Sequence, residues 1–562
     1  MSVIVGSPAT PGATEGRRGG GPLTATPRLL RLALRRDRFV IPAWLFGIAA
    51  ISGATVNAVT GLYTTDAQRH AAAAFSAENP IARAFNGPAS GSDIGALALL
   101  EGFVIVAVLV AIMSIQAVVR HTRGEEEAGR AELLGAAVVG RHARLGAAMA
   151  VGAAASSTAG LVFSGVLIAA GLSVGGSLAA GAALAGVGLV FAGVAGVSAQ
   201  VFSTSRAASG AALAALGLSV LLRALGDTAG EVAADGASLI SAWPSWLSPI
   251  GWGQQVRAFQ HDRWWVMVLF LAATVVLTAI AARLSVARDV GAGLIPARRG
   301  RAEAPASLRG VFGLAWRLQR GTLAAWAVGL SIIASSFGLV GESVEELVAN
   351  NDQLGEMLAT LAPGGSLTDT FFAFSSSLLG VAVGGFVVQA SLRMRAEEAG
   401  GRLEPILATA TSRQRWMASH LVIAVVGSVA LLTLVGASLG GSFVVATGAE
   451  ASEAARILGG ALVQVPAALV LGGLVTVAFA YLPRWASAIG WASVAFSFVI
   501  GQLGVGLALP EVVIDLSPFS HVPAVPASDL DLLPLVLLTV VAVVLHGVGI
   551  AGVRRRDLAI SA

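Results

Sequence analysis

Two short stretches concentrate charged side chains in an otherwise apolar chain. "HTRGEEEAGRAEL", His121–Leu133, has six charged residues in thirteen, although only 12% of the whole chain is charged. "RMRAEEAGGRLEP", Arg393–Pro405, nearly repeats it. Glutamates beside arginines at these spacings can form ion pairs, hold a metal ion or contact a charged partner. No pattern of histidine and carboxylate ligands surrounds the glutamates, so we expect no metal site there.

The two stretches align without a gap at an offset of 272 residues, and eight of nineteen positions are identical. The identical residues of the first copy are Arg123, Glu125, Glu126, Gly129, Arg130, Glu132, Ala136 and Arg141. Their counterparts in the second copy are Arg395, Glu397, Glu398, Gly401, Arg402, Glu404, Ala408 and Arg413. This repeat predicts a chain built from two related halves. A second, shorter repeat supports that prediction: "LSPIGW" begins at Leu247 and "LSPFSH" at Leu516.

The first copy has the pattern of a short charged helix. Glu126 and Arg130 are four residues apart, and Glu127 and Arg130 are three apart, so both pairs could form ion pairs on one helical face. An apolar stripe follows within Leu133–Val138, with Arg141 beyond it. Such a helix suits a groove on a partner protein. The alternative is a solvated loop whose charges only orient the neighbouring spans, but orientation needs arginines and not matched glutamates, so we favour docking.

The second copy differs from the first at two positions that matter for a helix. Pro405 replaces Leu133, and Ala399 replaces Glu127. A proline restricts the preceding residue to extended geometry and interrupts or starts a helix, so Glu404 is constrained where Glu132 is not. We therefore expect two unequal docking sites.

The composition shows what must position these stretches. Hydrophobic residues make up 56% of the 562 residues and the mean hydropathy is +0.79. A soluble domain is roughly 45–50% apolar and about 25% charged, so lipid must be the solvent for much of this chain. The absence of cysteine excludes disulfides and thiolate metal sites.

Twelve apolar runs are long enough to cross a bilayer, which takes roughly 20 residues. They cover residues 39–59, 96–119, 145–171, 177–202, 207–225, 264–283, 322–340, 371–391, 416–440, 457–481, 485–508 and 532–552. The runs are continuous and not alternating, which argues against a β-barrel. Each charged stretch follows the second run of a six-run half.

The arginines set the orientation. Every one of the 36 basic residues is an arginine, and with a cytoplasmic N-terminus thirty fall inside and six outside, as the positive-inside rule requires. We therefore expect a plasma-membrane protein with both termini on the cytoplasmic side. Six spans per half is an even number, so the halves are parallel. We therefore predict an all-α polytopic membrane protein with twelve transmembrane helices in two parallel six-helix repeats.

This organisation divides the chain into four parts. Residues 1–27 are a disordered N-terminus, 28–283 the first transmembrane half, 284–320 a cytoplasmic linker with an interfacial helix, and 321–562 the second half. The basic stretch "RLLRLALRRDR", Arg28–Arg38, is either an interfacial helix on an anionic leaflet or a flank that orients the first span.

At the charged stretches the chain resembles the ABC-2 type exporter permeases. It is most similar to their fused, twelve-span actinobacterial branch of tetronasin and multidrug export type, a type V ABC exporter-like fold. The resemblance implies a coupling helix between spans two and three, which docks on a separate ATPase subunit, and a small outer helix before the last span of each half. The implied coupling residues are Arg123, Glu125, Glu126, Arg130, Glu132 and Arg141, with Arg395, Glu397, Glu398, Arg402, Glu404 and Arg413 in the second half.

Energy must then come from outside this chain. A P-loop needs a lysine and the chain has none, so we expect no catalytic residue and no bound cofactor. We expect ATP and magnesium in a partner ATPase that is present in two copies. A proton-coupled secondary multidrug transporter is the alternative, but it would need acids or histidines within the spans, and these are sparse. An embedded hydrolase has only "GLSVG" and "GASLG", which lack the strand–turn–helix context of a nucleophile elbow.

The sequence gives the fewest indications about the transport path. The resemblance implies a cavity lined by spans two and five of each half. Polar in-span residues that could contact a small-molecule cargo are Asn57, Gln116, Gln389, Gln464 and Gln502, although such groups more often bond helix to helix. Because the spans are almost uncharged, we expect an apolar or amphipathic drug or antibiotic as cargo, and no nucleic acid partner.

Overall fold

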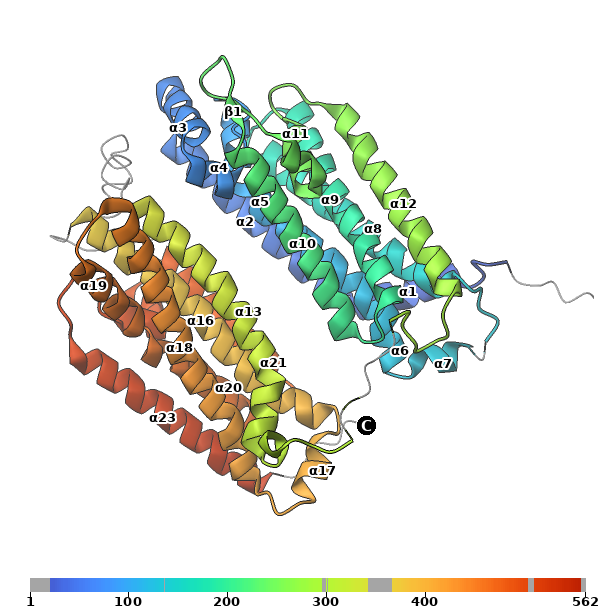
Figure 1. Cartoon of the computed structure of the whole chain (residues 1–562), viewed down its shortest axis with the longest axis vertical. Helices are drawn as coiled ribbons and strands as arrows, with labels where there is room; N and C mark the ends of the chain where they lie inside the picture. The colour runs from blue at the N-terminus through green and yellow to red at the C-terminus, as the bar shows by residue number, and fades with distance from the viewer. Residues whose placement is uncertain are drawn as a thin grey trace, which may run out of the picture. The chain divides into compact units, whose positions relative to one another are not determined.

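The computed structural model describes residues 21–135, 137–295, 300, 302–341, 366–503 and 510–556. The chain forms two compact units, Met1–Arg299 and Gly300–Ala562, and each has its own hydrophobic core (Figure 1). Almost all regular structure is helical. Among the described residues, two strands of two residues each, β1 (Glu231–Val232) and β2 (Leu239–Ile240), pair as an antiparallel hairpin in the first unit.

Long helices dominate the first unit. They are α2 (Val40–Leu62), α5 (Ile94–Val119), α8 (Ala143–Ala169), α9 (Val174–Val201), α10 (Ser205–Thr228) and α12 (Met267–Val286). Of these, α9 is the most enclosed by its neighbours, α5, α8 and α12. The amphipathic α1 (Thr26–Arg36) lies at one end of the unit, and α3 (Asp66–Glu78), α4 (Pro80–Asn86), η2 (Trp243–Leu247) and α11 (Pro249–Gln255) lie at the other (Figure 1).

The second unit repeats this order of long helices. It contains α13 (Val311–Val340), α16 (Leu367–Ala399), α18 (Arg413–Thr447), α19 (Ala451–Leu462), α20 (Val465–Tyr481), α21 (Ala486–Leu503) and α23 (Leu532–Arg555). Short helices α22 (Glu511–Ile514) and η6 (Pro518–His521) precede the last long one. The two "LSP" motifs have matching roles, because Ser248 caps α11 and Ser517 caps η6.

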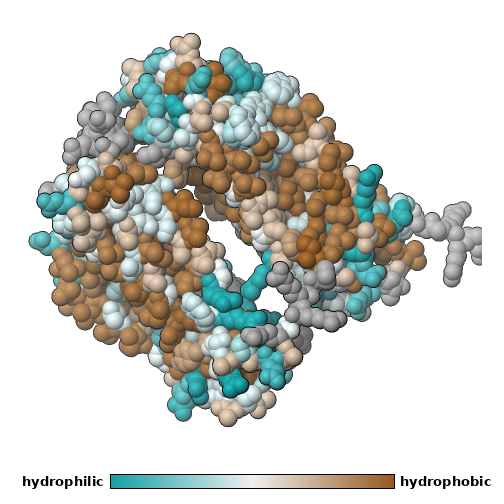
Figure 2. Space-filling model, viewed as in Figure 1, coloured by the Kyte–Doolittle hydropathy of each residue, from teal (hydrophilic) through white to brown (hydrophobic). Residues whose placement is uncertain are grey.

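Eleven helices of the described residues are long and apolar enough to cross a membrane. Hydrophobic residues cover their flanks and hydrophilic ones gather at their ends (Figure 2). The prediction of a predominantly helical chain with many helices able to cross a membrane is therefore confirmed. The remaining predicted run, 485–508, corresponds to α21, whose apolar part Ala486–Gly501 is shorter than the other spans, and residues 504–509 lie outside the described part.

Two segments differ from the sequence-based boundaries. Residues 1–20 of the predicted disordered terminus lie outside the described residues, but residues 21–27 are packed: Gly140 N donates to Thr24 O and His142 N to Pro22 O. Between the halves, the described residues hold no separate interfacial helix of more than one turn, because α13 already starts at Val311 and continues as one helix. Its amphipathic first turns are continuous with the span.

Small residues bring α8 and α9 into close contact. A Cβ atom added at Gly160 would overlap the carbonyl oxygen of Gly181, and one at Gly181 would overlap the hydroxyl of Ser164. Ser164 uses that space to donate 2.9 Å to the carbonyl of Ser177 on the facing helix. Without side chains in between, backbones in lipid gain dispersion contacts over their whole length.

We expect Gly160→Val to destabilise the first unit, because the added methyl groups would force α8 and α9 apart at a cost of about 1–3 kcal/mol. The matched control is Gly165→Val on the same helix, where an added Cβ meets nothing within 4 Å. The apparent melting temperature in detergent measures both. Equal melting temperatures for the two variants would show that close approach at Gly160 is unimportant.

Candidate functional site

The charged stretch of the first unit follows α5 through an unusual turn. α5 widens into the π-helix η1 (Arg120–Gly124), continues as α6 (Glu125–Glu127) and gives way to α7 (Arg130–Gly135). Gly129 has φ 70°, a left-handed conformation that favours glycine and turns the chain between α6 and α7. In the second unit α16 runs on without a π-turn, Gly401 has φ 66°, and α17 (Leu403–Leu407) follows.

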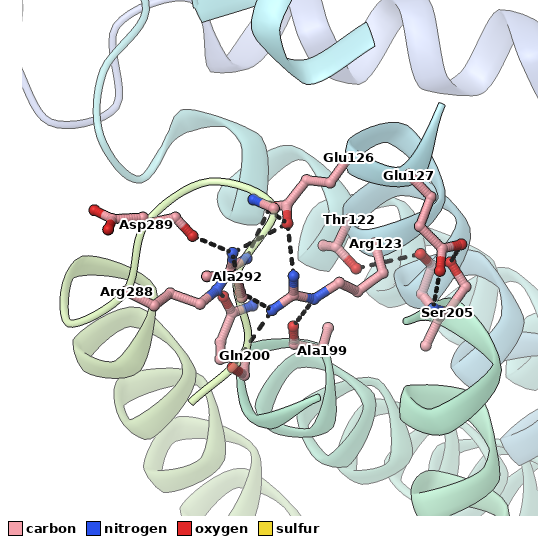
Figure 3. Close-up of polar contacts among 12 residues, drawn as sticks. Thr122, Arg123, Glu126, Glu127, Ala199, Gln200, Ser205, Arg288, Asp289 and Ala292 are labelled. Atoms are coloured by element: carbon pink, nitrogen blue, oxygen red, sulfur yellow. Dashed lines mark hydrogen bonds and ion pairs between the residues drawn. The ribbon is translucent and has the colours of Figure 1, made fainter. Parts of the chain in front are cut away.

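Arg123 is fully buried, and all its hydrogen-bond partners lie within the first unit. Its guanidinium donates to the carbonyl of Ala199 at the end of α9, 2.8 Å to that of Ala292, and 2.9 Å to the carboxylate of Glu126 (Figure 3). A cation at the C-terminus of a helix satisfies carbonyls that have no partner within the helix. Arg123 therefore joins the end of α5 to the end of α9.

Glu126 forms the central ion pair of this network. Its two carboxylate oxygens accept from Arg288, which follows α12, at 2.8 Å and 3.0 Å, and both side chains are only 7% exposed. Arg288 also donates 2.8 Å to Gln200 Oε1 on α9 (Figure 3). The loop after α5 is thus tied to the last long helix of the unit.

The second unit contains the same connection. Glu398 accepts from Arg556, which directly follows α23 and also donates 2.6 Å to the carbonyl of Phe479 on α20. Arg395 donates 2.9 Å to the carbonyl of Pro483, just beyond that helix. We call the pairs Glu126–Arg288 and Glu398–Arg556 the clamp pairs. Each joins the C-terminal end of the second long helix, or its direct continuation, to the end of the last one.

A second matched pair shapes the turn itself. Glu125 accepts from Arg130 at 2.8 Å, and Glu397 accepts from Arg402 at 2.9 Å, both over five residues. The hydrogen bond and negative charge of Glu125 raise the pKa of the exposed Arg130. Glu125 also accepts from Arg36 of α1, which brings the amphipathic helix to the turn.

The predicted pairs of Arg130 with Glu126 and Glu127 are wrong. The left-handed Gly129 ends α6, so helical spacing does not continue to Arg130. Glu126 instead forms its clamp pair, and Glu127 caps α10 by accepting from the backbone N and hydroxyl of Ser205.

Few of the twelve predicted coupling residues are free to meet a partner. Arg123, Glu126, Glu397 and Glu398 have buried side chains, and Glu125 is nearly so. Glu132 on α7 and Glu404 on α17 are exposed, as are the edges of Arg130 and Arg402. Arg413 donates to carbonyls at the end of α23, whereas Arg141 has no bonded partner among the residues that the structure describes. The exposed surface is therefore α7 and α17 themselves.

Within each unit, no hydrogen bond among the described residues joins the predicted path residues to one another. Asn57, Gln116 and Gln389 are exposed on their helices, and Gln389 accepts 2.8 Å from the indole of Trp326. Gln464 is buried between α19 and α20, against Gly380 of α16. Gln502 belongs to α21, but its side chain is outside the described residues.

An apolar pocket of about 410 Å³ lies within the second unit, between α13, α16 and α21. Its lining is Leu330, Ile333, Leu378, Leu379, Val381, Ala382, Trp491, Val494, Ala495 and Phe498. The sequence signal was the spacing of Trp491, Val494 and Phe498, which places them on one face of a helix. Trp326, the partner of Gln389, lies beside the pocket, because its ring and that of Trp491 both face Gly385.

Comparison with known proteins identifies the family. The family described as "Multidrug efflux system permease Rv1217c, C-terminal domain" matches residues 28–284 and 308–554. The multidrug efflux system permease protein Rv1217c of Mycobacterium tuberculosis is 35% identical over 559 residues, which cover 99% of this chain and 100% of that protein. The chain belongs to the Rv1217c family of multidrug efflux permeases. It is therefore a multi-pass membrane transport protein.

In this permease the sequence reasoning missed the partners of the glutamates. Arg288 and Arg556 were counted only among orienting charges, yet each directly follows the last long helix of a unit, and that shared position was the available signal. Asp37 was also missed. It is buried and accepts 2.6 Å from Arg120 and 2.8 Å from His121, which fixes α1 to η1.

We expect Glu126→Gln to destabilise the permease by about 3–5 kcal/mol, because removing one partner leaves the buried guanidinium groups of Arg288 and Arg123 uncompensated. Glu132→Gln, six residues away and exposed, is the matched control and should leave stability unchanged. Thermal unfolding in detergent, followed by loss of the monodisperse peak, measures both. A Glu126→Gln protein as stable as the control would contradict the clamp.

Proposed function

We propose that the permease is the membrane subunit of an ATP-driven exporter of the ABC-2 type. It moves apolar or amphipathic small molecules out of the cell and takes its energy from a separate ATPase subunit, present in two copies. The chain then has twelve spans in two parallel halves, with α21 as the eleventh. It lies in the plasma membrane. Both termini are on the cytoplasmic side, as are the helices α7 and α17 and thirty of the arginines.

The observation that carries this proposal is the matched pair of exposed short helices, each directly attached to a buried clamp. α7 follows Glu126 and α17 follows Glu398, and each glutamate binds an arginine at the end of its unit's last long helix. A force on α7 therefore reaches α5, α9 and α12 through bonded groups and not through a flexible loop. That is the property required of a helix that passes work from a motor to a transmembrane bundle.

The chain's own composition supports an external motor. Without a lysine it cannot form the P-loop that holds the β- and γ-phosphates of ATP. ATP and magnesium then bind in the partner. The exposed Arg130 and Arg402 are already paired with Glu125 and Glu397. Glu132 and Glu404 are the exposed acidic side chains of α7 and α17, so the ATPase surface that receives them is basic.

The apolar pocket of the second unit supports the choice of cargo. Apolar side chains from three helices line a space of about 410 Å³, which is within the range of small-molecule sites. Two of these helices, α16 and α21, are the second and fifth of their half. We assign the aromatic side chains of Trp491 and Phe498 to cargo contact.

We expect the double variant Glu132→Arg, Glu404→Arg to lose the ATPase subunit. Charge reversal at both exposed tips places like charges against a basic surface, so co-purification with the co-expressed ATPase should fall at least about tenfold. The permease itself should melt at the wild-type temperature, because neither side chain takes part in the buried networks. Pro405 does not hold Glu404 in extended geometry, as the sequence indicated, because both residues belong to the first turn of α17. Single Glu132→Ala and Glu404→Ala variants should still lose drug transport unequally, because α17 has Pro405 where α7 has Leu133.

Vesicles provide the decisive control for that prediction. The purified permease alone, in proteoliposomes with a proton gradient and no nucleotide, should not move a fluorescent amphipathic drug. Transport under those conditions would overturn the ATP-driven proposal and favour proton coupling. Undiminished co-purification of the double variant would instead show that α7 and α17 are not the docking sites.

We expect Phe498→Ala to lower the rate of efflux of an aromatic drug about fivefold, because an aromatic contact contributes about 1 kcal/mol. Phe496→Ala is the matched control, since Phe496 belongs to the same helix and is similarly exposed but does not line the pocket. Efflux from ATPase-containing vesicles measures both. Equal effects of the two variants would remove the pocket from the cargo path.

A further inference from the structure

A second pocket lies beneath α1 in the first unit, at the end that carries α6 and α7. α1, η1, the start of α8 and the segment after α12 enclose a volume of about 80 Å³. We call it the α1 pocket; Leu29, Arg36, Arg141, Arg144, Leu145 and Arg288 are the lining residues that the argument uses. Glu125, Glu126 and Arg141, three of the predicted coupling residues, also line it.

The charges that line the α1 pocket do not balance. Four arginines face two glutamates, Glu125 and Glu126. Both glutamates are already occupied, the first by Arg36 and Arg130 and the second by the clamp pair and Arg123. Arg141 and Arg144 are left without a carboxylate among the described residues. The pocket therefore carries an excess of two positive charges, one for each of these arginines.

Arg144 shows that excess most directly. Its Nη1 atom is buried and has no hydrogen-bond partner in the described part of the chain. A buried donor of this kind costs about 1–3 kcal/mol unless something binds it, and a charged one costs more. The atom is thus a hydrogen-bond donor in need of an acceptor that the chain itself does not supply.

The start of α8 adds to the positive potential. Arg144 belongs to the first turn of α8 and Arg141 directly precedes it, while that turn contains no acidic residue. Cations are unfavourable at a helix N-terminus, where the backbone N–H groups already attract anions. In the second unit the counterpart of Arg141, Arg413, instead donates to the carbonyls of Val553 and Arg556. Among the described residues, the guanidinium of Arg141 is thus available in the first unit, whereas that of its counterpart is bonded in the second.

The rest of the lining identifies the source of the anion. Leu29 and Leu32 of α1 and Leu145 of α8 provide apolar surface beside the arginines. α1 is amphipathic: Arg36 lines the pocket, and its other three arginines do not. A free inorganic anion would gain nothing from the leucines. A phospholipid would place its phosphate on Arg141 and Arg144 and its acyl chains along Leu29 and Leu145.

We propose that the α1 pocket binds the phosphate headgroup of an anionic phospholipid of the adjacent leaflet, through Arg141 and Arg144. The bound lipid adds a polar link between α1 and α8, which already pack together through Ala33 and Val151. It supplies the acceptor for Arg144 Nη1 and offsets the two unbalanced charges. This inference concerns the membrane and does not depend on how transport is driven.

Native mass spectrometry of the purified full chain with added dioleoyl phosphatidylglycerol tests the proposal. The wild type should retain one phosphatidylglycerol more tightly than it retains phosphatidylcholine. Arg144→Gln should bind that lipid about tenfold more weakly, the loss expected for one charge-assisted hydrogen bond, and Arg144→Lys should recover part of it. Arg415→Gln, in the first turn of α18 of the second unit, is the matched control and should bind as the wild type does.

Three outcomes would overturn it. The first is equal retention of phosphatidylglycerol by Arg144→Gln and the wild type. The second is equal affinity of the wild type for phosphatidylcholine and phosphatidylglycerol, which would show that net charge is not recognised. The third is displacement of the lipid by excess inorganic phosphate, which would make the pocket a free-anion site. Arg144→Lys also guards against misfolding, because it keeps the charge and nearly the length.

Discussion

The buried glutamate–arginine clamp is the interaction on which the rest of this permease depends. In lipid, helices have little hydrophobic reason to associate, so packing of small residues and a few polar links decide which ends stay together. Glu126 with Arg288, and Glu398 with Arg556, are such links, and each closes a unit by joining its second long helix to its last. Either charge alone would be costly to bury. Paired with each other, and with the arginines also donating to backbone carbonyls, both become structural.

The clamp also separates two roles that one short charged stretch contains. Residues that point inward, Arg123 and Glu126 above all, determine where α7 begins, while the outward Glu132 is free to meet another protein. An exporter whose motor is a separate subunit needs both: a rigid base and an accessible tip. In the first unit, the α1 pocket adds a further link at the end that carries α6 and α7. There a bound lipid would take the place of a protein side chain.

The sequence predicted the helical, multi-pass character because long apolar runs are strong, additive signals. It also located the charged stretches, since eight identities at one offset do not depend on tertiary structure. It did not reveal which glutamate faces which arginine. Arg288 is 162 residues from Glu126, and the left-handed Gly129 breaks the spacing on which the local pairing of Arg130 was predicted. Contacts over such distances depend on how helices pack, which periodicity does not encode.

The π-turn η1 records a difference between the two copies. Gln116 precedes Arg123 by seven residues, whereas Gln389 precedes Arg395 by six, and α16 is regular where α5 widens. One surplus residue in a regular helix would rotate everything after it by about 100° and move Glu126 away from Arg288. The wider turn absorbs that residue within Arg120–Gly124. The duplicated halves could therefore diverge in length here while the ion pair downstream kept its register.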